Sequence, residues 1–202
     1  MKLGSPPRAI VVPSFEPVMN AVQELQDRWH VWRGLRGHTQ LSDSSREGSR
    51  VYARGIVRAD GEMLVAPLSA LPCLAYRSRA WPTGSRQTAG NGPHELTRLR
   101  PFTLELGDDA VGIDGEHAIL ALPRVRLGND SSERKASFLA RHGSRDGYLG
   151  ESILQVGARV TIGGMLVLRR STHTGDREAG YRDPRARRWL VGDRDNPLVI
   201  RS

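Results

Sequence analysis

The sequence contains a single cysteine, Cys73, in 202 residues. One thiol can form neither an intramolecular disulfide nor a zinc site built from several thiolates. Cys73 follows Pro72 in an expected strand, and no nearby cation or helix terminus is evident to lower its pKa. We therefore interpret it as a buried, inert thiol rather than a nucleophile.

Long apolar runs are also absent. No stretch approaches the roughly 18 apolar residues that a helix needs to span a bilayer. The N-terminal residues 1–13 contain an apolar segment that proline interrupts and that is too short for the core of a signal peptide. These absences predict a soluble, cytoplasmic protein.

Lysine is scarce, although the chain is basic. Only Lys2 and Lys135 are lysines among 30 cationic residues, and the formal net charge is +8 with a sequence pI near 10.6. Such a charge indicates either an anionic partner, such as nucleic acid or a membrane surface, or an arginine-rich solvated surface. Because no more than two cations are consecutive, we favour the solvated surface.

No catalytic constellation stands out. No histidine pairs with another histidine or with cysteine at metal-ligand spacing, and no Gly-x-Ser-x-Gly elbow or phosphate-loop lysine is present. The histidines are His30, His38, His94, His117, His142 and His173. We therefore expect no catalytic residue, no metal, no cofactor and no enzymatic activity.

Residues 1–36 are expected to form an N-terminal extension with an amphipathic helix. One apolar stripe recurs at helical spacing, made by Val18, Val22, Leu25, Trp29 and Trp32. We expect this stripe to pack on the chain's own sheet. The alternative is a groove-binding or membrane-surface helix, with Val22, Leu25, Trp29 and Trp32 as the candidate partner-binding residues.

Residues 37–50 form a polar linker, and residues 51–202 show the pattern of short strands. Asp60-Gly61 predicts a hairpin between residues 51–58 and 62–66, and Gly163-Gly164 predicts a second hairpin within residues 151–168. Residues 135–142 fit either a strand or a short helix. The fold class that follows is mainly β (α+β), a compact antiparallel β-barrel or sandwich with an N-terminal amphipathic helix.

An arginine-rich insertion interrupts the strands at residues 169–188, with seven arginines against three acidic residues. Arginine with interleaved aromatics can grip phosphates and stack on bases, so this is the candidate anion or nucleic-acid site. Its residues are Arg169, Arg170, Tyr181, Arg182, Arg185, Arg187 and Arg188. The alternative, which we favour, is a solvated hairpin tip.

Four blocks of sequence, in order, carry a family resemblance. The first contains Gly55, Ala66–Ser69, Pro72-Cys73 and Tyr76-Arg77, and the second joins Pro101–Leu104 to Val111–Asp114. The third and fourth are Glu151–Val160 with Gly163, and Leu190–Asp193 with Pro197–Ile200. Over residues 51–202 the chain resembles the GIDE, or "beside a membrane", domain, which occurs in a mitochondrial outer-membrane E3 ubiquitin ligase and in many bacterial proteins.

The resemblance implies a β-rich binding module with no catalytic residue. The chain lacks the transmembrane helices of the family and the Cys/His-rich RING of its ligase members, so we expect no ligase activity in isolation. We therefore predict a non-enzymatic protein-binding or scaffold module, with another protein as partner. The alternatives are a nucleic-acid-binding module and an accessory component of a ubiquitin-ligase-like system that acts with a separate catalytic partner.

Overall fold

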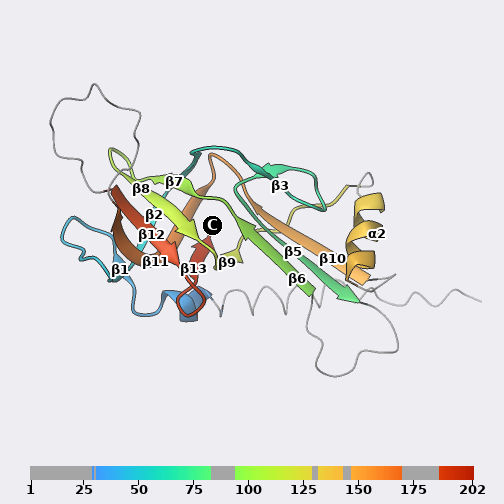
Figure 1. Cartoon of the computed structure of the whole chain (residues 1–202), viewed down its shortest axis with the longest axis horizontal. Helices are drawn as coiled ribbons and strands as arrows, with labels where there is room; N and C mark the ends of the chain where they lie inside the picture. The colour runs from blue at the N-terminus through green and yellow to red at the C-terminus, as the bar shows by residue number, and fades with distance from the viewer. Residues whose placement is uncertain (1–28, 30, 83–93, 129–131, 143–146, 170–186) are drawn as a thin grey trace, which may run out of the picture.

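The computed structural model describes residue 29 and residues 31–82, 94–128, 132–142, 147–169 and 187–202. Within these ranges strands dominate, as predicted (Figure 1). The strands are β1 (Thr39–Gln40), β2 (Arg50–Ala59), β3 (Leu64–Val65), β4 (Pro72–Cys73), β5 (Ala75–Pro82), β6 (His94–Leu99), β7 (Phe102–Glu105), β8 (Ala110–Gly115), β9 (Ala118–Ala121), β10 (Gly147–Leu154), β11 (Arg159–Arg169), β12 (Arg187–Gly192) and β13 (Leu198–Arg201). The helix α2 spans Ser132–Arg141, which decides the ambiguous residues 135–142 in favour of a helix.

Five of these strands close into a barrel. Strand β2 pairs with β7 on one side and with β11 on the other. Strands β8 and β12 lie between β7 and β11 and complete the ring. Closure leaves no unpaired edge within the ring, which removes a site of unwanted strand pairing. The barrel alternative of the predicted fold class is therefore confirmed.

The order of the strands around the ring identifies the type of barrel topology. Numbered along the chain, β2, β7, β8, β11 and β12 are barrel strands one to five, and the ring runs one, two, three, five, four and back to one. All neighbours are antiparallel except β8 and β12, which are parallel. This is the strand order of an OB-type barrel, a five-stranded Greek key.

The barrel interior forms the main hydrophobic core. Because side chains alternate along a strand, every second one points into the barrel. Each barrel strand contributes residues that are fully or almost fully buried. Examples are Val51, Phe102, Ile113, Ile162 and Leu190. Each such burial stabilises the fold by about 1.5–3 kcal/mol.

A second layer lies beside the barrel, at the right of Figure 1. Strand β5 pairs with β10 on one edge and β6 on the other, so segments inserted at two places in the barrel meet in one three-stranded sheet. Helix α2 packs on this sheet through its buried Phe138 and Leu139, which lie in one cluster with Leu68 and Ala80. The insertions are thus a folded extension of the barrel.

The expected hairpin at Asp60-Gly61 is wrong. Strand β2 does form, but the chain leaves it after Ala59, and β3 pairs with β4 instead. The reason is that both edges of β2 are occupied by β7 and β11, whose pairing closes the barrel. The chain does turn away at Asp60-Gly61, as the local signal predicts. The partners of β2, however, are strands distant in sequence.

The turn expected at Gly163-Gly164 is also wrong, because both glycines lie inside the continuous strand β11. Their missing side chains admit close neighbours: a Cβ at Gly164 would lie 2.7 Å from Cδ2 of Leu198, and one at Gly163 would collide with Leu35. The GIDE resemblance also implies that residues 190–200 form a closing hairpin, and this pairing is wrong as well. Strands β12 and β13 form, but each pairs with a different part of β11.

Candidate functional site

The most concentrated buried polar cluster surrounds Glu151 on β10. Its carboxylate accepts hydrogen bonds from the backbone N–H groups of Leu68 and Ser69 at 3.0 and 2.7 Å, and from Oγ of Ser78 at 2.7 Å. The side chain is 1% exposed, so water does not share in these bonds. Arg134 of α2 donates to the carbonyl of Leu68 at 3.0 Å and fixes the same turn from outside.

The Glu151 cluster also affects the neighbouring thiol. Burial raises the pKa of Cys73 to about 11, and the negative charge of Glu151 adds to the effect. Cys73 is fully buried, as predicted, and it packs with Ala66 and Tyr76. This thiol is protonated at neutral pH and is not an activated nucleophile.

Residues that carry the GIDE resemblance meet in this cluster. Leu68 and Ser69 come from the first block, and Glu151 from the third. Beside Glu151, Ser152 donates through Oγ to the carbonyl of Leu122 at 3.1 Å. The bonds of Glu151 join the turn at Leu68 and Ser69 to the three-stranded sheet, so this part of the pattern has a structural role.

The arginine-rich insertion lies between β11 and β12, which are barrel strands four and five. Of its candidate residues, Arg170, Tyr181, Arg182 and Arg185 fall outside the described residues. Arg169, Arg187 and Arg188 belong to the ends of the two strands. The structure therefore places only the base of the predicted site.

Acidic neighbours already engage two of these three arginines. Arg169 forms an ion pair with Asp114 at 2.7 Å, and its guanidinium lies 5.0 Å from the ring centroid of Trp189. Arg188 pairs with Asp109 and, at 3.4 Å, with Asp43. Ion pairing on the outer face of the barrel reduces the positive charge that this part of the site offers to a phosphate.

The helical segment of residues 31–35 lies across the outside of the barrel. Val31 is 4% exposed, and Gly34 approaches the branched side chain of Val199 so closely that a Cβ there would lie 2.7 Å from Cγ2. Leu35 packs over Gly163 in the middle of β11. The segment is thus held to the barrel by Val31, Gly34 and Leu35.

The two tryptophans of the predicted stripe do not take part in this packing. Trp29 is 51% exposed and Trp32 is 60% exposed. The expectation that they pack on the chain's own sheet is therefore wrong, because the buried face of the segment is offset from them. Val18, Val22 and Leu25 fall outside the described residues.

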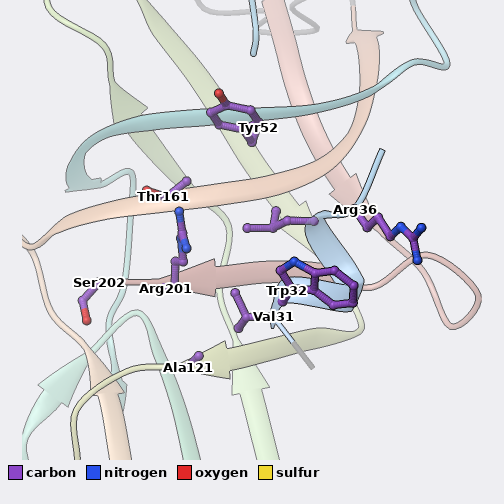
Figure 2. A pocket seen from close by; sticks show the side chains of 9 residues that line it. Val31, Trp32, Arg36, Tyr52, Ala121, Thr161, Arg201 and Ser202 are labelled. Atoms are coloured by element: carbon purple, nitrogen blue, oxygen red, sulfur yellow. The ribbon is translucent and has the colours of Figure 1, made fainter. Parts of the chain in front are cut away.

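A groove runs between this helical segment and the outer faces of β2, β9, β11 and β13 (Figure 2). Its volume is about 690 Å³. We call it the tryptophan groove, and its lining residues are Val31, Trp32, Leu35, Arg36, Tyr52, Ala121, Thr161, Arg201 and Ser202. Arg36 lies over the ring of Trp32, with 5.4 Å from its guanidinium carbon to the ring centroid.

A second, smaller cavity of about 320 Å³ also adjoins this segment, and it is lined by Arg33, His38, Arg50 and Asp195 among others. Nδ1 of His38 is buried and has no hydrogen-bond partner among the described residues. Burial lowers the pKa of His38, and the positive charge of Arg50 lowers it further. His38 is therefore biased towards its neutral form.

Two kinds of feature are absent from the described residues. These residues contain no helix long and apolar enough to cross a membrane. No group of three or more His, Cys, Asp or Glu side chains gathers among them as a set of metal ligands.

Comparisons with protein-family models, with curated proteins and with solved structures found no match. The GIDE resemblance therefore stays a prediction. The fold and the sites define the protein only as a closed five-stranded barrel with a folded extension and an exposed aromatic groove.

Sequence reasoning singled out Trp32 but missed the other walls of the tryptophan groove. Tyr52, Ala121, Thr161 and Arg201 come from four strands that are far apart in the chain. Each is an ordinary outward-facing strand residue, so no local signal marks it. Only the pairing of β2, β11, β13 and β9 brings these positions together.

Proposed function

We propose that the protein is a non-enzymatic binding module that engages another protein through the tryptophan groove. The observation that carries this proposal is the exposure of Trp32 in the lining of a groove of about 690 Å³. Tryptophan is the residue most enriched, with tyrosine and arginine, among the side chains that dominate protein–protein binding energy. Here Trp32, Tyr52 and Arg36 line one groove.

The packing of the helical segment supports the same proposal. The segment is fixed by Val31, so Trp32 is presented from a rigid support rather than from a loose peptide. A pre-positioned aromatic side chain loses little conformational entropy on binding. The GIDE resemblance, if it holds, implies a binding module as well.

Site-specific photo-crosslinking in the native host tests the proposal. A photo-reactive amino acid replaces Trp32 in the full chain, and a matched variant carries it at Arg100, an exposed residue that does not line the groove. We expect a partner protein to be trapped from position 32 and not from position 100. Equal trapping at both positions, or trapping at neither, contradicts the proposal.

Nucleic-acid binding is a second candidate, and the barrel topology favours it. OB-type barrels bind oligonucleotides with strands two and three and with the loops after strands one and four. In this chain the arginine-rich insertion is the connection between strands four and five, β11 and β12. The most basic segment of the sequence thus occupies a position used for such ligands.

Salt dependence separates this candidate from the first. Neutralised phosphates release counterions, so the affinity for single-stranded DNA should fall steeply with salt concentration. Replacing Arg185, Arg187 and Arg188 with alanine should flatten that slope, whereas Trp32→Ala should leave it unchanged. If the wild-type chain binds no DNA at low salt, the nucleic-acid candidate fails.

A further inference from the structure

We propose that the tryptophan groove takes an acidic segment of the partner protein, with an apolar anchor side chain seated against Trp32 and carboxylates on both sides of it. This inference rests on the proposed function and names the chemistry of the partner. It follows from the apolar walls of the groove and from the sign of the charges at its rim.

The walls of the groove suit an apolar anchor. Val31 and Leu35 come from the helical segment, and Ala121 and Tyr52 come from the strands opposite (Figure 2). Trp32 remains 60% exposed beside them, so a partner side chain can cover a large aromatic surface that now meets water. Removing that surface from water is the main favourable term in such binding.

The charged side chains that line this groove are both cationic. Arg36 and Arg201 line the groove, and no side chain that lines it is acidic. In Figure 2 the two arginines lie on opposite sides of Trp32, one on the helical segment and one on β13. A carboxylate on each side of the anchor would therefore meet a guanidinium, which forms strong charge-assisted hydrogen bonds with carboxylates.

On the outer face of the barrel near β8, by contrast, positive charges are paired with acidic side chains. There Arg169 and Arg188 are paired with Asp114 and Asp109 within the chain. No ion pair with a described acidic residue engages Arg36 or Arg201. In the groove, therefore, two guanidinium groups lie beside exposed aromatic surface with no ion-pair partner among the described acidic residues.

A protein segment fits this surface better than a nucleic acid does. Proteins that bind single strands combine a cationic track along the backbone with several stacking rings. The tryptophan groove offers two cations, and aliphatic side chains make up much of the rest of its lining. Aromatic and arginine side chains around an apolar centre are the composition of protein interfaces.

NMR spectroscopy of the ¹⁵N-labelled full chain provides the test. The chain has four tryptophans, so it gives four indole N–H signals, and Trp32→Phe assigns the one from the groove. The probe is a capped peptide with a central Leu-Phe pair flanked on both sides by Glu and Asp. Matched peptides replace the acidic flanks by Lys and Gln, or the central pair by Gly-Gly.

We expect the acidic Leu-Phe peptide to shift the Trp32 indole signal in a saturable way, and the matched peptides to bind at least about tenfold more weakly. Arg36→Gln combined with Arg201→Gln should weaken the acidic peptide at least about tenfold. The matched control, Arg100→Gln combined with Arg126→Gln, should bind as the wild type does. Both control residues are exposed and lie outside the groove lining.

Several results would overturn the inference. They are equal binding of the Lys-flanked peptide, a shift of Trp32 caused by single-stranded DNA alone, and a Trp32 signal that changes with protein concentration without peptide. The last result would make a second copy the occupant. A Trp32 signal that shifts on deletion of residues 1–28 would make the chain's own N-terminus the occupant.

The outcome also separates this inference from the proposed function. If the crosslinker at position 32 traps a partner but the acidic peptide does not bind, the protein-binding function holds and the acidic chemistry is wrong. If neither experiment succeeds, both proposals fail together.

Discussion

The carboxylate of Glu151 accepts the backbone N–H of Ser69 at a distance of 2.7 Å, across 82 positions of sequence. The same carboxylate accepts from Leu68 and Ser78, so one buried acid holds a turn of the barrel insertion against β10. A carboxylate with several donors is stable when buried, but donors left without it are costly. Through these hydrogen bonds, Glu151 holds the turn at Leu68 and Ser69 to the three-stranded sheet of the extension.

Glu151→Ala should lower the free energy of unfolding by about 3 kcal/mol or more, because two buried donors and one part-buried donor lose their acceptor. Urea unfolding measures this change. Glu116→Ala, at an exposed position, should stay within about 0.5 kcal/mol of the wild type. Should Glu151→Ala fail to fold, Glu151→Gln should still show faster hydrogen exchange at Leu68 and Ser69, and unchanged exchange there would contradict the role given to Glu151.

Cys73 should be inert in the folded protein. Its pKa is raised to about 11 by burial and then by the charge of Glu151, and the side chain is fully buried. A thiol-specific reagent at pH 8 should label the native chain negligibly and the denatured chain quickly. Rapid labelling of the native chain would show that the thiol is accessible.

The same shift predicts a loss of stability at high pH. The folded pKa of Cys73 lies above its ordinary value of 9.0, so the folded chain binds the proton more tightly than the unfolded chain does. This contribution to stability is complete below pH 9 and is lost as the pH rises towards 11. Cys73→Ala should show a shallower loss of unfolding free energy over that range.

Strand positions and the buried cysteine could be predicted from the sequence, but strand partners could not. Alternating apolar residues and turn signals are local, and they correctly indicated a strand at residues 51–58. The pairing of β2 with β7 depends on Gly55, where any Cβ would collide with the carbonyl oxygen of Glu105. Nothing near Gly55 in the sequence reveals that neighbour.

The candidate site shows the same limit. Helical spacing identified Trp29 and Trp32 as members of an apolar stripe, which by itself fits a core and an interface equally well. Which of these holds depends on which face of residues 31–35 meets the barrel, and in the structure Gly34 lies against Val199. The contact joins positions 165 residues apart, so no local pattern reveals it, and the expectation that both tryptophans pack on the chain's own sheet was wrong.

Substitutions at the adjacent residues Val31 and Trp32 should differ in how much they lower the free energy of unfolding. Val31 is 4% exposed, so Val31→Ala should cost about 1–2 kcal/mol of unfolding free energy through the apolar surface and cavity that it creates. Trp32 is 60% exposed, so Trp32→Ala should change stability by no more than about 0.5 kcal/mol. Thermal and urea unfolding of both variants measure the difference, and a larger cost for Trp32→Ala would place that ring in the core.

His38 should make the folded chain less stable at low pH. Burial lowers the pKa of His38 from its ordinary 6.5, and Arg50 lowers it further, while the nearby carbonyls of Leu35 and Arg36 oppose the shift. Arg33 and Asp195 are the other charged residues that line the same cavity. Below pH 6.5 the unfolded chain therefore binds a proton at this position that the folded chain resists.

It follows that His38 contributes stability above pH 6.5, and that this contribution is lost as the pH falls through its lowered folded pKa. Urea unfolding at a series of pH values should show a fall in stability below that point, and NMR titration of the imidazole should give a pKa under 6.5. His38→Asn should show a smaller fall than the wild type, whereas His117→Asn, at an exposed position, should keep the wild-type profile. An imidazole that titrates at or above its ordinary pKa would contradict the buried, unpartnered placement of Nδ1, because only burial and the charge of Arg50 hold that pKa down.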